Sequence, residues 1–325
     1  MRLEDIGFYT LSDHRADTAT QHSPLIRCEL ILTGWCNFNC VYCRGLRKDF
    51  LPELRVEDAA SVVVKWAGHG LENIRFSGGE PTLWPGLVRL VLLAVECGIR
   101  RRALSTNGSA PLGEYDRLLR AGVNDFSISL DARCSADAGV MAGGNGAFWD
   151  RLVENIRWLV ARTYVTVGVV LTERNAAETA QIVQFAHDLG VADIRVIPAA
   201  QYGAMNAGLA GIPENVLNAH PILKYRAQNA ACGRGARGLR PGDAPRCSLV
   251  LDDMVAMGGH HFPCIIYMRE GGDPIGRLAG RSMDDVRRER AEWMACHDTR
   301  ADQICRANCL DVCIDYNNRA ANKSA

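Results

Sequence analysis

The sequence predicts an α/β fold, a partial parallel (β/α)6 barrel followed by a small cysteine-rich C-terminal domain. Between about residues 28 and 200, short apolar runs alternate with longer helix-like stretches. Several of the short runs are rich in Val, Ile or Leu, as buried parallel strands are, and such strands are joined by right-handed crossovers. Because only six strands are visible, we expect an incomplete barrel. Beyond about residue 200 the alternation ends and cysteines become frequent.

Each expected strand except the last is followed by an expected helix. The strands are Glu29–Thr33, Asn73–Ser77, Arg102–Thr106, Asp125–Leu130, Tyr164–Leu171 and Asp193–Pro198. The helices lie near 56–68, 85–97, 112–121, 147–161 and 176–189. We expect Asn175 to cap the last helix and Gly190 to end it. The chain is thus divided into an N-terminal extension (1–27), the barrel (28–200), connecting loops (201–246), the cysteine-rich domain (247–318) and a frayed tail (319–325).

The composition argues against several classes of partner. Lys plus Arg equals Asp plus Glu, at 37 each, so the charge gives no reason to expect nucleic acid or an anionic membrane. No stretch approaches the roughly 18 uncharged apolar residues of a membrane span. The acidic residues Glu4, Asp5 and Asp13 are untypical of a signal peptide. We therefore expect a cytoplasmic protein. We expect its 13 cysteines to include metal ligands rather than to form disulfides.

A compact cysteine group follows the first expected strand. Cys36, Cys40 and Cys43 form the pattern C-x3-C-x2-C. Three thiolates in one loop can bind three irons of a [4Fe–4S] cube, which leaves the fourth iron open to an exogenous ligand. A structural zinc loop is the alternative, although zinc sites usually show paired C-x2-C units and a fourth ligand.

With Tyr42 at the aromatic position, the pattern C-x3-C-x-aromatic-C resembles the radical S-adenosylmethionine (SAM) superfamily. The resemblance covers roughly residues 26–200. It implies a SAM-binding [4Fe–4S] cluster, SAM itself, and an electron donor such as flavodoxin or ferredoxin. It also implies the reaction, in which reductive cleavage of SAM gives a 5′-deoxyadenosyl radical that abstracts a hydrogen atom from the substrate.

Segments at successive strand ends agree with this resemblance. Ser77-Gly78-Gly79-Glu80-Pro81 looks like the family's GGE motif, in which the glycines let the backbone approach the ligand and Glu80 pairs with the amino group of SAM. By resemblance, the later strand ends place these residues against SAM: Asn107, Ser129, Asn175 or Glu173, and Val196-Ile197 along the adenine. For Asn107, Ser129 and Asn175, local turn or capping work is an equal alternative.

A second cysteine group begins at Cys247. The unit C-x11-G-x4-C runs from Cys247 through Gly259 to Cys264, and it resembles the SPASM and twitch extensions of radical SAM enzymes. The resemblance implies one auxiliary [4Fe–4S] cluster, bound by Cys247, Cys264 and two of the three downstream cysteines Cys305, Cys309 and Cys313. If residues 305–313 are helical, all three lie on one face, so the sequence does not choose the pair. A four-thiolate zinc site is the alternative. His260 and His261 are expected to be solvated loop residues, and hydrogen-bond donors around the cluster are the alternative.

Cys134 follows the fourth expected strand, near the barrel mouth. A thiol there could return a hydrogen atom to a substrate radical and invert a stereocentre, whereas an inert residue is the alternative. Residues 1–27 are too few for the leader-peptide-binding domain of many peptide-modifying relatives, which favours a small polar metabolite as substrate. We therefore predict an oxidoreductase or isomerase that epimerises or dehydrogenates such a molecule. The alternatives are a SPASM-type peptide- or protein-modifying enzyme and a non-enzymatic metal-stapled binding module.

Overall fold

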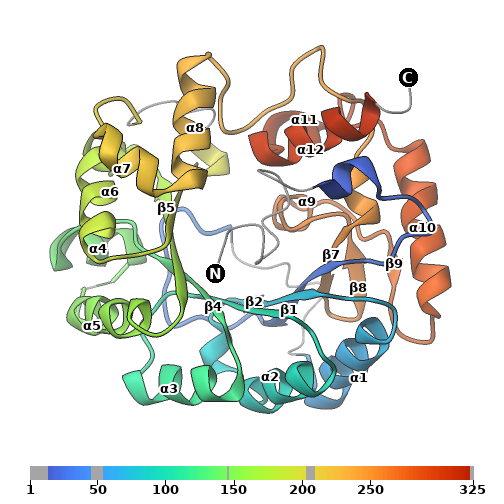
Figure 1. The fold of residues 1–325 in the computed structure, drawn as a ribbon, viewed down its shortest axis with the longest axis horizontal. Coiled ribbons are helices and arrows are strands. Elements are labelled where there is room, and N and C mark those ends of the chain that lie inside the picture. The colour runs from blue at the N-terminus through green and yellow to red at the C-terminus, as the bar shows by residue number, and fades with distance from the viewer. Residues whose placement is uncertain (1–13, 45–53, 145, 203–208, 323–325) are drawn as a thin grey trace. The chain divides into compact units, whose positions relative to one another are not determined.

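The computed structural model describes residues 14–44, 54–144, 146–202 and 209–322, which fall into two compact units. Unit 1 contains Met1–Trp35, Arg44–Ala103 and Gly238–Ala325, and unit 2 contains Cys36–Cys43 and Leu104–Arg237. Strand β3 (Arg101–Thr106) runs across the boundary. Both units are built on strands of a mostly parallel, open α/β sheet (Figure 1). This confirms the predicted fold class.

In unit 1 the central strand is β1 (Arg27–Thr33). It pairs in parallel with β2 (Asn73–Gly78) on one side and with β7 (Asp253–Met257) on the other. Two antiparallel strands, β8 (His260–Phe262) and β9 (Gly276–Arg277), continue the sheet beyond β7. The helices of this unit are α1 (Val56–Ala67), α2 (Leu87–Glu96), α9 (Ile265–Arg269), α10 (Met283–Cys296), α11 (Gln303–Asn308) and α12 (Asp311–Ala321).

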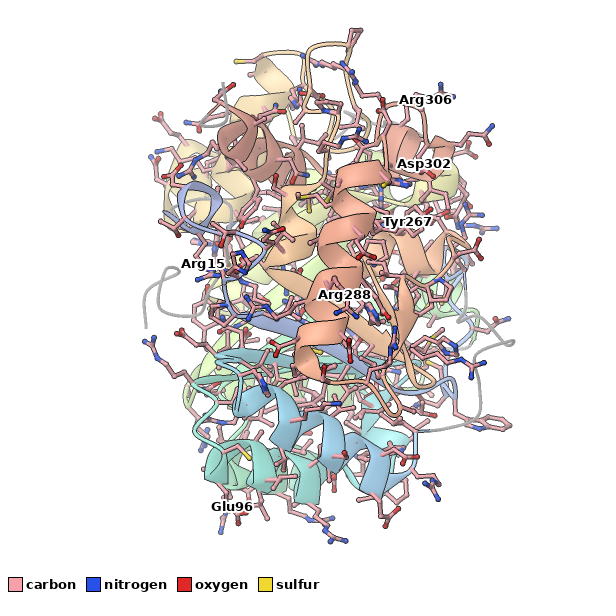
Figure 2. The ribbon with its side chains drawn as sticks, turned by 90° about the vertical axis from the view of Figure 1, so that its right-hand side faces the viewer. Arg15, Glu96, Tyr267, Arg288, Asp302 and Arg306 are labelled. Atoms are coloured by element: carbon pink, nitrogen blue, oxygen red, sulfur yellow. The ribbon has the colours of Figure 1, made fainter. Side chains whose placement is uncertain are left out.

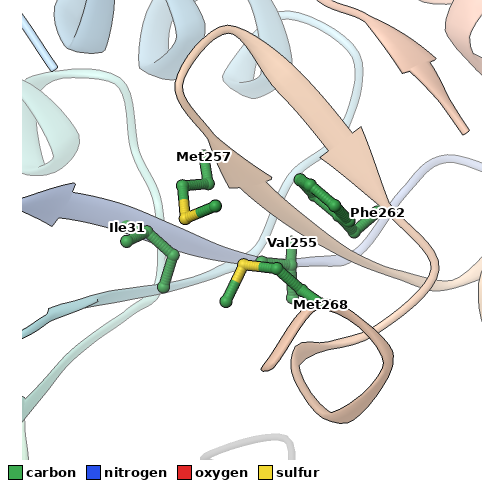
Figure 3. Packing of buried hydrophobic residues seen from close by; sticks show 5 residues of the cluster. All are labelled: Ile31, Val255, Met257, Phe262 and Met268. Atoms are coloured by element: carbon green, nitrogen blue, oxygen red, sulfur yellow. The ribbon is translucent and has the colours of Figure 1, made fainter. Parts of the chain in front are cut away.

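The hairpin β7–β8 turns through two glycines in the left-handed region, Gly258 at φ 53° and Gly259 at φ 79°. A two-residue turn with both φ values positive matches the twist of a hairpin and favours glycine. The hairpin packs on β1 and α9 through one buried apolar cluster (Figure 3), made of Ile31, Val255, Met257, Phe262 and Met268. The segment that carries Cys264 is therefore held by the core of the unit.

In unit 2 three parallel strands lie side by side, namely β4 (Asp125–Ser129), β5 (Tyr164–Leu171) and β6 (Asp193–Pro198). One face of each strand is apolar and buried, as Ile128, Val167 and Val196 show. The helices of this unit are α3 (Leu112–Ala121), α4 (Ser135–Ala142), α5 (Trp149–Val160), α6 (Thr179–Asp188), α7 (Glu214–Ala219) and α8 (Pro221–Ala231).

The six predicted barrel strands are present, each within two residues of its expected ends, and so are the five helices between them. Three expectations differ from the structure. Residues 201–246 are not only connecting loops, because they contain α7 and α8. The 247–318 segment contributes β7 to the sheet, beside β1. Helix α4 was not expected. Gly190 ends α6 with φ 82°, as predicted.

Parts of two expected segments, the N-terminal extension and the frayed tail, lie outside the described residues at 1–13 and 323–325. In the described part of the chain, no helix combines the length and the apolar character needed to cross a bilayer.

Candidate cluster sites

The loop Cys36–Cys43 carries three free thiols and is fixed in unit 2 by backbone hydrogen bonds to the end of α4. The N–H of Asn39 donates to the Ala142 carbonyl at 3.0 Å, and that of Val41 donates to the Met141 carbonyl at 3.1 Å. Helix α4 then ends at Gly143, whose φ is 67° and where a Cβ would lie 2.2 Å from the Asn39 carbonyl oxygen. Only glycine tolerates that approach. Gly143 thus allows the backbone of the cysteine loop to approach the end of α4, a helix that the sequence did not predict.

The three thiols are close enough to affect one another. The pKa of the Cys40 thiol is raised to about 12 by burial, by the Asp131 carboxylate and by the neighbouring Cys43 and Cys36 thiols. Thiols that resist ionisation next to one another need a cation to become thiolates together. Three cysteines on one short loop are the donor set that iron–sulfur clusters take, so these residues fit the [4Fe–4S] cluster that the motif implies.

Asn107 supports this loop. Its Nδ2 donates to Asn37 Oδ1 at 2.8 Å and lies 3.9 Å from Cys36 Sγ. Its Oδ1 accepts from the backbone N–H and the hydroxyl of Ser109, at 3.0 and 2.7 Å. The side chain therefore orders the chain around Cys36, which corresponds to the local role that the sequence left open beside SAM contact.

Tyr42 also ties the loop to unit 2. Its hydroxyl donates to Asp131 Oδ2 at 2.5 Å, and Asp131 Oδ1 accepts from the Val170 N–H at 2.6 Å. Burial raises the pKa of Asp131 to about 6, against the lowering effect of those two hydrogen bonds. Asp131 follows β4 directly, so the contact fixes the loop to the end of that strand.

Asn175 stands at the N-cap position of the 3-10 helix Ala176–Glu178 that precedes α6, but its side chain makes no capping hydrogen bond, contrary to expectation. It is buried, and its Nδ2 donates to the Asp131 carbonyl at 3.0 Å and to the Val170 carbonyl at 2.9 Å. Its Oδ1 accepts from the Thr172 N–H at 2.8 Å. Both amide hydrogens are therefore used in joining the ends of β4 and β5, which makes Asn175 a positioning residue. Ser129 is exposed at the end of β4, and Ile197 is half-buried on β6.

The inner face of the three strands in unit 2 is polar. Ser129, Gly168 and Arg195 lie in register across β4, β5 and β6. Nothing lies within 4 Å of a Cβ built on Gly168, so this face is open at that point. The Arg195 guanidinium contacts the hydroxyls of Ser127 and Thr166. Sequence reasoning named Ser129 but missed Arg195 and Thr166, which only the pairing of the strands brings beside it.

Cys134 begins α4, and its thiol lies 2.9 Å from Asp137 Oδ2. The residue is partly exposed.

In unit 1 the GGE segment is hydrogen-bonded to the backbone at and just after the end of β1. The Gly79 N–H donates to the Thr33 carbonyl at 2.8 Å and the Glu80 N–H to the Trp35 carbonyl at 2.7 Å. A Cβ on Gly78 would lie 2.5 Å from the Thr33 carbonyl oxygen, and one on Gly79 would lie 2.1 Å from that of Trp35. The two glycines thus leave room for the backbone of Thr33 and Trp35, just before Cys36. The sequence did not reveal this contact. Buried Glu80 caps a short 3-10 helix, since its Oε1 accepts from the Thr82 N–H and hydroxyl.

A second site in unit 1 is an apolar cavity lined by five cysteines. They are Cys247, Cys264, Cys305, Cys309 and Cys313. Apolar side chains, among them Leu249, Pro263 and Ile314, complete the lining. The structure therefore brings together all five cysteines that the sequence proposed for an auxiliary cluster.

Residues 305–313 do not form one continuous helix, because α11 ends at Asn308 and α12 begins at Asp311. The three thiols nevertheless line one cavity, with Cys305 on α11, Cys309 directly after it and Cys313 on α12.

All five thiols take part in a mutual influence on their pKa values. The pKa of the Cys305 thiol is raised by burial and then by Cys247 and Cys264. That of Cys309 is raised by burial and then by Cys313, Cys247, Cys264 and Cys305. Such a buried thiol group is stable as thiolates only around a metal. Two N–H groups point at sulfurs, from Tyr267 to Cys264 Sγ at 3.4 Å and from Asn317 to Cys247 Sγ at 3.6 Å. The donor set fits an iron–sulfur cluster.

One rim of the cavity offers other ligands. His297, Asp302 and Cys305 present ligand atoms within 4.8 Å of one another. Tyr267 and Asp302, both labelled in Figure 2, lie on this rim, where the Tyr267 hydroxyl is 3.4 Å from Asp302 Oδ2. Sequence reasoning did not single out His297 or Asp302, because neither belongs to a spaced cysteine pattern. His261 is fully buried rather than solvated, which corrects that expectation.

Comparisons with known proteins agree with the sequence motif. Residues 30–186 match the family model of the radical SAM superfamily. The chain is 30% identical to the GTP 3′,8-cyclase of Marinobacter nauticus over 188 residues, which are 56% of this chain and 57% of that protein. It is also 30% identical to the AdoMet-dependent heme synthase of Methanosarcina barkeri over 163 residues, 49% of this chain and 46% of that protein. The chain thus spans about half the length of the curated relatives it matches.

Solved structures share the fold over more of the chain. Native anSMEcpe with bound AdoMet and Kp18Cys peptide superposes with a TM-score of 0.62 at 14% identity, covering 93% of this chain and 97% of that chain. SuiB of Streptococcus suis bound to S-adenosylmethionine gives a TM-score of 0.60 at 15% identity, covering 82% and 65%. These likenesses show the fold alone. The match of residues 30–186 to the radical SAM model identifies a domain of that superfamily, which uses a [4Fe–4S] cluster and SAM.

Proposed function

We propose that the protein is a radical SAM enzyme in which Cys36, Cys40 and Cys43 hold the SAM-cleaving [4Fe–4S] cluster. The observation that carries this proposal is the group of three mutually interacting thiols on one fixed loop of a radical SAM domain. When bound, the reduced cluster supplies the electron that cleaves SAM to methionine and a 5′-deoxyadenosyl radical. The chain's own residues position the loop: Asn107 orders the chain around Cys36, and Asp131 anchors Tyr42. Glu80 is proposed to meet the amino group of SAM, with Gly78 and Gly79 shaping that segment, and Ser129 and Ile197 to contact SAM.

We further propose one auxiliary [4Fe–4S] cluster in the cavity of unit 1. Its ligands are Cys247, Cys264, Cys305 and Cys309, because each of the two downstream thiols is coupled to both upstream ones. Cys313 lies beside Cys309 without being needed as a fifth ligand. The apolar lining keeps water away from such a cluster.

Anaerobic reconstitution tests both clusters. We expect about eight irons per chain, as two four-iron cubes require, and 5′-deoxyadenosine when SAM and dithionite are added. Replacing Cys36, Cys40 and Cys43 by Ala should leave about four irons and abolish 5′-deoxyadenosine. Zinc instead of iron, with no cleavage of SAM, would support a metal-stapled binding module and refute the enzyme.

As substrate we propose a small polar metabolite, which is epimerised or dehydrogenated. The polar residues on one face of the strands in unit 2 support this proposal, since the exposed hydroxyl of Ser129 and the partly exposed guanidinium of Arg195 can hydrogen-bond a polar molecule. For epimerisation, the partly exposed Cys134 thiol would give its hydrogen atom to the substrate radical. The thiyl radical left on Cys134 would return to the thiol by taking one electron from the one-electron donor and a proton from solvent. Cys134→Ala should then abolish product while SAM cleavage persists, and wild-type product formed in D2O should carry one deuterium. Full product formation by Cys134→Ala would remove Cys134 as the donor.

A peptide- or protein-modifying enzyme is the second candidate. Its support is the likeness over nearly the whole chain to anSMEcpe, a structure that contains a bound peptide. The two candidates separate by substrate. Modification of a peptide encoded beside the gene would favour the second, whereas turnover of a free metabolite would favour the first. In either case we expect a one-electron donor such as flavodoxin or ferredoxin.

A further inference from the structure

Arg290 on α10 is a fully buried cation with all five N–H groups in use. Its side chain is among the largest fully buried ones in the chain. Nε donates to the Val250 carbonyl at 2.9 Å. Nη1 donates to the Phe262 carbonyl at 3.0 Å and to His261 Nδ1 at 3.2 Å. Nη2 donates to the Asp253 and Pro263 carbonyls. None of these five acceptors carries a negative charge.

The acceptors belong to the two segments that carry the upstream cysteines of the cavity. Val250 lies in the turn that starts directly after Cys247, and Phe262 and Pro263 directly precede Cys264. One turn further along α10, Trp293 lines the cavity itself. The guanidinium therefore joins the Cys247 and Cys264 segments at the wall of the five-cysteine cavity.

A buried charge needs a compensating charge nearby. Burial lowers the pKa of Arg290 to about 10, so the group is still a cation at neutral pH. Its charge is favoured by the Asp253 carboxylate and, once they are thiolates, by Cys28, Cys247 and Cys264. Burial raises the pKa of Asp253 to about 6, so this carboxylate is present at neutral pH and loses its charge as the pH falls through about 6. Glu289 acts only through His261, to whose Nε2 it lies at 3.0 Å.

We infer that Arg290 is the counter-cation of the auxiliary cluster and raises its reduction potential. This inference rests on the auxiliary cluster proposed above. With thiolates at Cys247 and Cys264, the guanidinium gains the negative neighbours that its hydrogen bonds lack. Reduction adds one electron to the cluster and thus one more negative charge beside a fixed cation. A nearby positive charge in a site of low dielectric favours the reduced state, because charges and hydrogen bonds around a cluster set its potential.

The test measures the potential of the auxiliary cluster alone. The full-length chain carries Cys36, Cys40 and Cys43 replaced by Ala, is reconstituted anaerobically, and is titrated with dithionite while electron paramagnetic resonance reports the reduced cluster. In this background Arg290→Gln removes the charge, and Arg290→Lys keeps it but loses most of the hydrogen bonds. Arg288→Gln is the matched control, because it removes one Arg from the exposed face of the same helix (Figure 2).

We expect Arg290→Gln to weaken the preference for the reduced state at least tenfold, a fall of about 59 mV for one electron. Arg290→Lys should restore more than half of this fall, and Arg288→Gln should leave the potential unchanged. A loaded Arg290→Gln protein with the wild-type potential would overturn the inference. If neither Arg290 variant holds iron, Arg290 is required for assembly of the site, and the inference that it sets the potential of the cluster is overturned. Failure of the background protein to hold about four irons would instead refute the auxiliary cluster itself.

Discussion

Asp193 gives the chain a stability that depends on pH. It is fully buried at the start of β6, where Oδ1 accepts from the Ile194 N–H at 2.7 Å and Oδ2 from the Ile222 N–H at 3.0 Å. It therefore satisfies an amide in the first turn of α8, which starts at Pro221. Burial nevertheless outweighs these bonds and raises the pKa of Asp193 from 3.8 to about 6.

The sign of the effect follows from proton binding. Between about pH 4 and 6 the folded protein keeps a proton on Asp193 that the unfolded chain has lost, so stability falls as the pH rises through this window. The whole shift corresponds to about 3 kcal/mol, and the part between pH 5.0 and 7.5 to about 1.4 kcal/mol. Asp193→Asn removes the titrating group, although it leaves one N–H facing an amide instead of an oxygen. The free energy of unfolding of the variant should thus lose this slope.

Urea unfolding at pH 5.0, 6.0 and 7.5 measures the difference between wild type and variant. We expect Asp193→Asn to be less stable than wild type at pH 5.0, and the gap to shrink by about 1.4 kcal/mol at pH 7.5. Asp188→Asn is the control, because it makes the same charge change at an exposed position of the same unit. Parallel profiles for wild type and Asp193→Asn would refute the raised pKa and the reasoning from burial.

Three further predictions concern the cluster sites. Gly79→Ala should destabilise the protein by about 1–3 kcal/mol, as overpacking does, because a Cβ would lie 2.1 Å from the Trp35 carbonyl oxygen; an unchanged melting temperature would contradict this. Asn107→Ala should speed the loss of iron from the first cluster on exposure to a chelator, whereas retention at the wild-type rate would show that Asn107 does not order the loop. Cys309→Ser should lose the auxiliary cluster and Cys313→Ser should keep it, as measured by iron content; the reverse result would replace Cys309 by Cys313 in the ligand set.

Local sequence patterns predicted the barrel strands because a buried strand is a short run of apolar residues, which can be recognised without its partners. Tyr164–Leu171, for example, is apolar enough to be recognised alone, and its observed ends match the prediction. Strand β7 could not be predicted in the same way. Its pairing with β1 joins Cys28 to Met254, far apart in the sequence, and only the folded chain reveals this partner. Helices α7 and α8 follow segments rich in Gly and Ala, where periodicity is weak.

Cysteine spacing pointed to thiols that lie together in the structure, and their role as cluster ligands stays a prediction. The groups that act on these thiols come from elsewhere in the chain. Arg290 lies 26 residues after Cys264, on a helix whose sequence is charged throughout, so nothing in the local pattern distinguishes it from exposed Arg288. Burial of one arginine and exposure of the other is a property of packing, which a single sequence does not contain.

The polar residues at the strand ends show why the role of a motif residue needs the structure. Asn107 and Asn175 were assigned to SAM by resemblance, with local hydrogen bonding as the equal alternative. An amide side chain offers two donors and an acceptor, and backbone groups satisfy these as well as a ligand does. In the structure both amide hydrogens of Asn175 bind carbonyls at the ends of β4 and β5, including that of Asp131, whose carboxylate accepts from Tyr42. Asn175 therefore acts on the cluster loop through Asp131, so replacing it should disturb the loop before it affects any contact with SAM.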